Sequence, residues 1–178
     1  MKKKDILIPV RLDEKTYRDF CRFDTMVMRR RWFKPVLAGM ICWTLALAGL
    51  LSKQPGIETP AGVLAGLGLA IPAMFFGLYA LQVRAQAAER GLKDAPLVYT
   101  ITLGDAVTVE NNARAEPPVT LAWERLAAAY RVPGCIYLYV NAEHAFLLPS
   151  AHASAPEDAV WRCLTQRLGE NRCFDRRR

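Results

Sequence analysis

Residues 35–51, PVLAGMICWTLALAGLL, and residues 61–83, AGVLAGLGLAIPAMFFGLYALQV, set the architecture of this chain. Neither stretch contains a charged side chain, and they are about 17 and about 23 residues long. A helix needs roughly 20 apolar residues to cross the hydrocarbon core of a bilayer, whereas apolar stretches of about 10 to 14 residues are more typical of buried helices in soluble domains. The two stretches therefore predict a two-span transmembrane hairpin over residues 33–84.

Small residues recur at spacings of three and four along both stretches. The first stripe is Gly39, Cys42, Ala46 and Gly49, and the second stripe is Gly62, Gly66, Ala70, Ala73 and Gly77. Membrane helices associate by close backbone approach, because lipid gives little hydrophobic drive for helices to meet. We expect the hairpin to close on itself through these stripes, although one stripe could instead form the seam of a homodimer.

Basic residues gather at one end of the predicted hairpin. This basic collar comprises Arg29, Arg30, Arg31 and Lys34 before the first span, with Arg84 and Arg90 after the second. The link between the spans carries Lys53, offset by Glu58. The positive-inside rule then predicts a multi-pass protein of the bacterial inner membrane with both termini in the cytoplasm. The collar would also attract anionic lipid, at about 1 kcal/mol per residue near the surface.

Composition excludes several classes of function. The net charge of the 178 residues is +7, and much of it lies in the collar or the C-terminal arginines, so we expect no nucleic-acid partner. The number of cysteines is odd, and no two of them have the close spacing that is typical of zinc ligands. We therefore expect no metal or cofactor. The five cysteines are Cys21, Cys42, Cys135, Cys163 and Cys173.

The rest of the chain predicts a domain of strands and helices. Residues 6–12 alternate like a strand, and Asp13 has the features of the N-cap of a helix. After the hairpin, six short alternating segments joined by turns predict an antiparallel meander. A last helix is expected between a capping box, Ser154 to Glu157, and Gly169.

The N-terminal strand has no evident partner except the C-terminal sheet. We therefore expect an α+β, mostly-β cytoplasmic domain: a bent antiparallel sheet of about seven strands, the first from the N-terminus, capped by a C-terminal helix. The predicted organisation is residues 1–32, a strand and helix that join this domain, residues 33–84, the hairpin, and residues 85–178, the body of the domain.

Several segments in this order resemble the YcxB-like family of bacterial membrane proteins. They are the helix with Tyr17 and Phe20, the arginines before the hairpin, and the segments YTITL at 99–103, LAWERL at 121–126 and FLLP at 146–149. The resemblance covers nearly the whole chain and implies a pleckstrin-homology-like cytoplasmic domain. The family's biochemical role is undefined, so the resemblance implies no site residues. Members often carry a basic residue after the Pro149 position, where this chain has Ser150.

Catalysis is not indicated, because an enzyme needs a nucleophile, base or metal set that converges in space. The two histidines, His144 and His152, fall in predicted loops. Four of the acidic residues that follow the hairpin fall on predicted solvent faces or turns: Glu110, Glu116, Glu124 and Glu143. We therefore expect a non-enzymatic protein, with a membrane-associated enzyme as the least favoured alternative.

Tyr137 and Tyr139 form the candidate partner surface. They share the strand face opposite Ile136, Leu138 and Val140. They could therefore receive a peptide or a neighbouring helix, or equally pack against Tyr17 and Phe20 of the N-terminal helix. Trp123 and Trp161 are expected in the core. The leading hypothesis is protein–protein interaction or self-association by the cytoplasmic domain. The alternative is binding of anionic lipid headgroups by the basic collar.

Overall fold

The computed structural model describes residues 5–52, 55–94, 96–112 and 117–177. The chain divides into two compact units. The α/β unit comprises Met1–Phe20 and Gly91–Arg178, and the helical unit comprises Cys21–Arg90. The units thus meet in the chain at residues 20/21 and 90/91, whereas the sequence placed the limits of the hairpin at 32/33 and 84/85. Lys53 and Glu116 lie outside the described residues.

The first sheet of the α/β unit is antiparallel and contains the N-terminal strand. Its order is β1-β2-β3-β4, formed by β1 (Ile6–Arg11), β2 (Leu97–Leu103), β3 (Val107–Asn111) and β4 (Val119–Leu121). Ile8 pairs with Ile101 across the first two strands. The prediction that the N-terminal strand completes the C-terminal sheet is therefore confirmed, and the pairing lies within one chain.

The second sheet is mixed. Its order is β7-β6-β5-β8, formed by β5 (Ala128–Val132), β6 (Cys135–Tyr139), β7 (Ala145–Pro149) and β8 (Cys173–Asp175). The pair β5–β8 is parallel and the other pairs are antiparallel. The described residues thus form eight strands in two sheets. The prediction of one bent sheet of about seven strands is wrong, and the layout does not support a pleckstrin-homology fold.

Helix α1 (Glu14–Phe23) begins where the sequence predicts, because the Thr16 amide donates to Asp13 Oδ1 at 3.0 Å. Helix α4 (Glu157–Leu168) ends at Gly169, whose φ of +84° favours glycine. Its predicted capping box is wrong. Ser154 Oγ instead accepts a hydrogen bond from the Leu7 amide at 3.0 Å, which ties the chain before α4 to β1.

The two sheets and α4 enclose one apolar core. Its fully buried members include Ile8, Val10, Ile101, Leu103, Val107, Leu126, Ala129, Ile136, Leu138, Leu148 and Leu164. Trp123 is also buried, as predicted, and its Nε1 donates to the Gly104 carbonyl at 3.2 Å. Short 3₁₀ helices connect the elements of this unit: η2 (Leu92–Asp94), η3 (Trp123–Arg125), η4 (Ser150–His152) and η5 (Glu170–Arg172).

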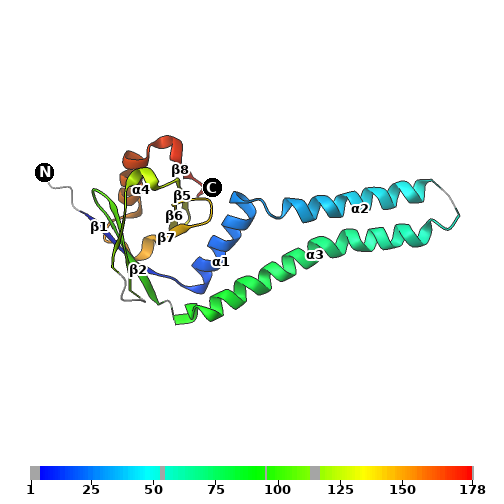
Figure 1. Cartoon of the computed structure of the whole chain (residues 1–178), viewed down its shortest axis with the longest axis horizontal. Helices are drawn as coiled ribbons and strands as arrows, with labels where there is room; N and C mark the ends of the chain where they lie inside the picture. Colours follow the sequence, from blue (N-terminus) through cyan, green and yellow to red (C-terminus); the bar gives the residue numbers. More distant parts are fainter. Residues whose placement is uncertain (1–4, 53–54, 95, 113–116, 178) are drawn as a thin grey trace. The chain divides into compact units, whose positions relative to one another are not determined.

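The helical unit contains two long helices that lie side by side, α2 (Phe33–Leu51) and α3 (Glu58–Glu89) (Figure 1). They run antiparallel, because Gly39 approaches Gly68 while Gly49 approaches Ile57. A π-helical turn, η1 (Asp24–Met28), precedes α2, and α3 continues through Pro72. The predicted pair of long apolar helices is therefore confirmed.

Candidate functional site

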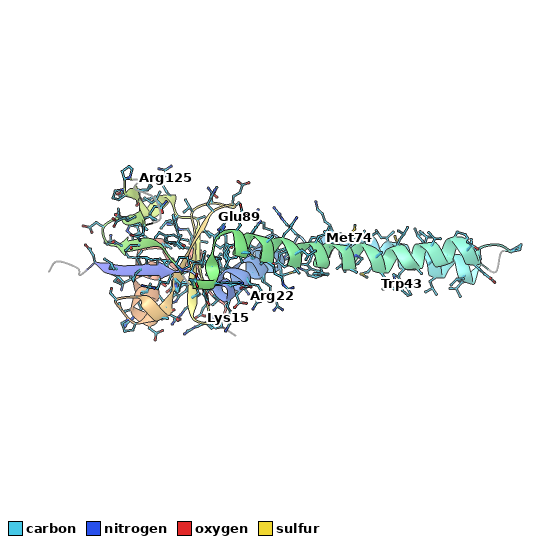
Figure 2. The ribbon with its side chains drawn as sticks, turned by 90° about the horizontal axis from the view of Figure 1, so that it is seen from below. Lys15, Arg22, Trp43, Met74, Glu89 and Arg125 are labelled. Atoms are coloured by element: carbon cyan, nitrogen blue, oxygen red, sulfur yellow. The ribbon has the colours of Figure 1, made fainter. Side chains whose placement is uncertain are left out.

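Both long helices carry their large apolar side chains on the outside of the helical unit. Met74, labelled in Figure 2, is 63% exposed, and Leu47 of α2 is 58% exposed. Both helices are long and apolar enough to cross a membrane. A core helix of a soluble protein would bury most of this surface, whereas these two leave most of it open. The outer surface of the helical unit is therefore suited to lipid.

The two helices touch through glycines that allow their backbones to approach. A Cβ atom added at Gly39 would lie 2.6 Å from the Gly68 carbonyl oxygen, so neither helix has room for a side chain there. Ala46 of the first stripe is also buried, while Cys42 and Gly49 are half-buried. The first stripe thus lies on the face of α2 that meets α3.

The second stripe does not take part in this contact. Gly62, Gly66 and Gly77 have open space around the position of an added Cβ atom, and Ala70 and Ala73 are exposed. Helix α3 instead buries Ala61 and Gly68, which lie on a different face. The prediction that both stripes close the hairpin is therefore wrong for the second stripe. Among the residues that the structure describes, none covers this face of α3 at Gly62, Gly66 or Gly77.

The basic collar lies at the end of the helical unit where α2 begins and α3 ends. Arg30, Arg31, Lys34 and Arg84 are exposed, as is Arg90 just beyond α3. Arg29 differs, because its Nε lies 2.8 Å from Asp24 Oδ2 and its backbone amide donates to the Asp24 carbonyl. Both contacts of Arg29 are thus with Asp24, the first residue of η1, and they stabilise this turn.

The two tyrosines of the candidate partner surface are buried. Tyr137 and Tyr139 are 2% and 3% exposed, because both faces of β6 are covered. The Phe20 ring of α1 meets Tyr137 edge-on at 5.2 Å between ring centroids, and it lies 6.4 Å from the Tyr139 ring. Of the two alternatives left open by the sequence, packing against the N-terminal helix is the one that the structure supports. These tyrosines are not available to a partner.

Sequence reasoning missed the main polar cluster of the α/β unit, which is centred on Arg131 of β5. The Arg131 side chain is only 4% exposed, and its Nε donates to Glu157 Oε1 at 2.6 Å while Nη2 donates to Asp158 Oδ1 at 2.5 Å. Its guanidinium carbon also lies 5.8 Å from the centre of the Trp161 ring. Ser150 Oγ completes the cluster by donating to Glu157 Oε2 at 2.6 Å.

Each charged group named in this cluster has a partner of opposite charge. Burial lowers the pKa of Arg131, but the hydrogen bonds to Asp158 and Glu157 outweigh burial, so the pKa is raised and the guanidinium stays charged. The same hydrogen bond from Arg131 lowers the pKa of Asp158. Paired in this way, Arg131 fastens the first turn of α4 to the middle of the second sheet. We interpret the cluster as structural, since its charged groups satisfy one another.

Arg131 was missed because the sequence analysis assigned the wrong face of β5 to the core. The alternation of Ala128, Tyr130 and Val132 indicates a buried face, but the structure buries Ala129 and Arg131 instead. The signal was available in the sequence, because Glu157 and Asp158 open the next helix and provide two carboxylates for one inward-facing arginine.

The described residues offer no metal site. They contain no group of three or more histidine, cysteine or acidic side chains able to hold a metal ion. His144 is exposed, and its Nδ1 lies 3.2 Å from Asn141 Oδ1 in a turn. Burial raises the pKa of Cys135 to about 12, so that thiol stays protonated at neutral pH and is a poor nucleophile.

A small cavity lies beside the Arg131 cluster. Its walls include Ile8, Ile136, Ser150 and Glu157, and its volume is about 10 Å³. That volume is enough for about one water molecule, whereas sites for small molecules are usually about 300 to 1,000 Å³. The cavity is therefore too small for an organic substrate.

Comparisons of this chain with protein-family models, with curated proteins and with solved structures give no match. The resemblance to the YcxB-like family stays a prediction that rests on the order of the segments in the sequence. Arguments about function therefore rest on the geometry of the two units.

Proposed function

We propose that this chain is a non-enzymatic, membrane-anchored protein that works by associating with another protein or with itself. The observation that carries the proposal is the helical unit, in which two antiparallel helices turn their large apolar side chains outward. Such a surface is stable in hydrocarbon and costly in water. The α/β unit then serves as the part that a partner recognises at the membrane.

The proposed orientation places both termini on the cytoplasmic side of a bacterial inner membrane. The support is the basic collar at one end of the helical unit, whereas the link at the other end has a single basic residue, Lys53, offset by Glu58. A cysteine introduced at Gly56, in an otherwise cysteine-free chain, should react with a membrane-impermeant maleimide added outside intact cells. Reaction only after the membrane is opened would reverse the orientation.

Self-association is supported by the uncovered second stripe. In lipid, small residues on one face of a helix let another helix approach closely, and Gly62, Gly66 and Gly77 leave that room open on α3. Association through a soluble partner would instead use the α/β unit. The buried tyrosines Tyr137 and Tyr139 are no longer part of this proposal.

The test is the mass of the purified protein in mild detergent, by light scattering, together with a pull-down from native membranes. Self-association predicts an oligomer that Gly66→Ile converts to monomer, because the larger side chain fills the open space. The matched control is Ala48→Ile, which enlarges an exposed small residue of α2 outside both stripes. A monomeric mass with no stoichiometric companion would contradict the proposal.

A further inference from the structure

The members of the basic collar that precede α2 differ in their surroundings: Arg29 is ion-paired, whereas the next three basic residues are exposed. The charge of Arg29 is paired with that of Asp24, with 2.8 Å between Arg29 Nε and Asp24 Oδ2. The next residue, Arg30, adopts a φ of +46°, which is uncommon for a residue other than glycine. This turn ends η1 and begins the approach to α2. Arg30, Arg31 and Lys34 all remain exposed immediately after it.

An anchored tryptophan fixes the level of these cations relative to the apolar part of α2. The Trp32 Nε1 donates to the Met26 carbonyl at 3.0 Å, so the ring is held against η1. The ring of Phe33, which is 54% exposed, meets the Trp32 ring edge-on at 6.2 Å. Tryptophan and its aromatic neighbours favour the boundary between headgroups and hydrocarbon. Arg30 and Arg31 directly precede that boundary.

Helix α3 supplies a fourth cation at the same end of the helical unit. Arg84 is exposed and directly follows Val83, the last residue of the apolar stretch. The nearest acidic residues of the helical unit in sequence are Asp24, which is paired with Arg29, and Glu89, which lies more than a turn beyond Arg84. Arg30, Arg31, Lys34 and Arg84 thus give this end of the helical unit an excess of positive charge.

We propose that Arg30, Arg31, Lys34 and Arg84 form a binding surface for the headgroups of anionic phospholipids. Three guanidinium groups can each donate two parallel hydrogen bonds to a phosphate, and the exposed lysine adds a fourth positive charge. The proposal rests on the membrane anchoring proposed above and adds a preference for lipid charge. Each cation should tighten binding about fivefold, which corresponds to about 1 kcal/mol.

The experiment compares the full-length protein with two charge variants in detergent micelles that contain equal amounts of phosphatidylglycerol and phosphatidylcholine. The collar variant is R30Q/R31Q/K34Q/R84Q. The matched control, R11Q/R18Q/R125Q/R162Q, removes the same charge from exposed positions of the α/β unit. Lipid that stays bound through size-exclusion chromatography is counted by mass spectrometry. A change of membrane orientation cannot affect this measurement, because no bilayer is present.

The unmodified protein and the control should retain phosphatidylglycerol over phosphatidylcholine by at least tenfold, and the collar variant should retain the two equally. Equal retention by the unmodified protein would overturn the proposal and leave the collar with a role in orientation alone. An equal loss in both variants would overturn it too, since total charge would then be the cause. If the collar variant is unfolded by circular dichroism, the pair R30Q/R31Q serves instead and should reduce the preference by at least fivefold.

Flotation with vesicles of pure phosphatidylcholine separates this proposal from the proposed anchoring. The unmodified protein and both variants should float with these neutral vesicles, because anchoring depends on the apolar helices. Failure of all three to float would contradict the anchoring itself, whatever their preference for lipid charge.

Discussion

The two units of this protein treat apolar side chains in opposite ways. In the α/β unit, Leu138 and Leu164 are completely buried between the sheets and α4. In the helical unit, Leu47 and Leu69 are 58% and 64% exposed, and glycines of α2 and α3 let the two backbones approach each other. Water drives the packing of the first unit, whereas the second has the surface expected of a structure surrounded by lipid. The two units thus have surfaces suited to two different solvents, water for the α/β unit and hydrocarbon for the helical unit.

Truncation of one leucine in each unit tests this difference and should give the largest effect. Leu138→Ala should lower the free energy of unfolding of the α/β unit by about 2 to 5 kcal/mol, because it leaves a cavity in a closed core. Leu47→Ala should change the stability of the detergent-solubilised protein by less than about 1 kcal/mol, since that side chain is largely exposed. Denaturant titration followed by circular dichroism measures both. Equal losses would remove the distinction between the units.

Breaking the Arg131 cluster should give the next largest effect, confined to the α/β unit. Arg131→Met should lower the free energy of unfolding by about 2 to 3 kcal/mol, because Glu157 and Asp158 lose their partner at the sheet. The exposed Arg125→Met is the control and should change stability by less than about 0.5 kcal/mol. If both variants melt alike by calorimetry, the cluster does not fasten α4.

Glycine substitutions sharpen the comparison inside the helical unit. Gly39→Ala should destabilise the helix pair by about 1 to 2 kcal/mol, because the new Cβ meets the Gly68 carbonyl at 2.6 Å. Within a single hairpin, apart from any self-association through the second stripe, Gly66→Ala should be neutral or stabilising by up to about 1 kcal/mol, since alanine favours a helix and space is open there. Thermal unfolding in detergent distinguishes them. A larger loss for Gly66→Ala would place the helix contact on the second stripe.

Acidification should give the smallest effect, again in the α/β unit. The hydrogen bond from Arg131 holds the pKa of Asp158 below its usual value of 3.8, so the folded state releases this proton more readily than the unfolded state. The resulting stability is present above about pH 4 and is lost as the pH falls through the lower, folded pKa. Melting temperatures measured between pH 5 and pH 2 should fall more steeply in the unmodified protein than in Arg131→Met. Parallel curves would contradict the assignment.

Three features of the fold could be predicted from the sequence. The two apolar stretches, the pairing of the N-terminal strand with the later sheet and the glycine that ends α4 all follow from composition, spacing or the lack of another partner. Strand β8 could not be predicted, because three residues are too few to show alternation and its pairing with β5 is parallel.

The candidate surfaces were harder to predict, because exposure depends on what other segments cover. Tyr137 and Tyr139 alternate as if they faced solvent, but Phe20, more than a hundred residues earlier, covers them. The two stripes of small residues look alike in the sequence, yet the contact between α2 and α3 uses only the first. The face that a helix turns to its neighbour depends on the register of the pair, which the spacing of small residues does not determine.

The pairing of β1 with β2 has a consequence for the order in which the protein is made. The ribosome releases β1 first, but its partner emerges only after the whole helical unit has been synthesised. Until then the strand has no template, and closing so long a loop is slow compared with forming the local contacts between α2 and α3. The helical unit can therefore assemble while the α/β unit is still incomplete, and β1 joins its sheet only after β2 has been synthesised.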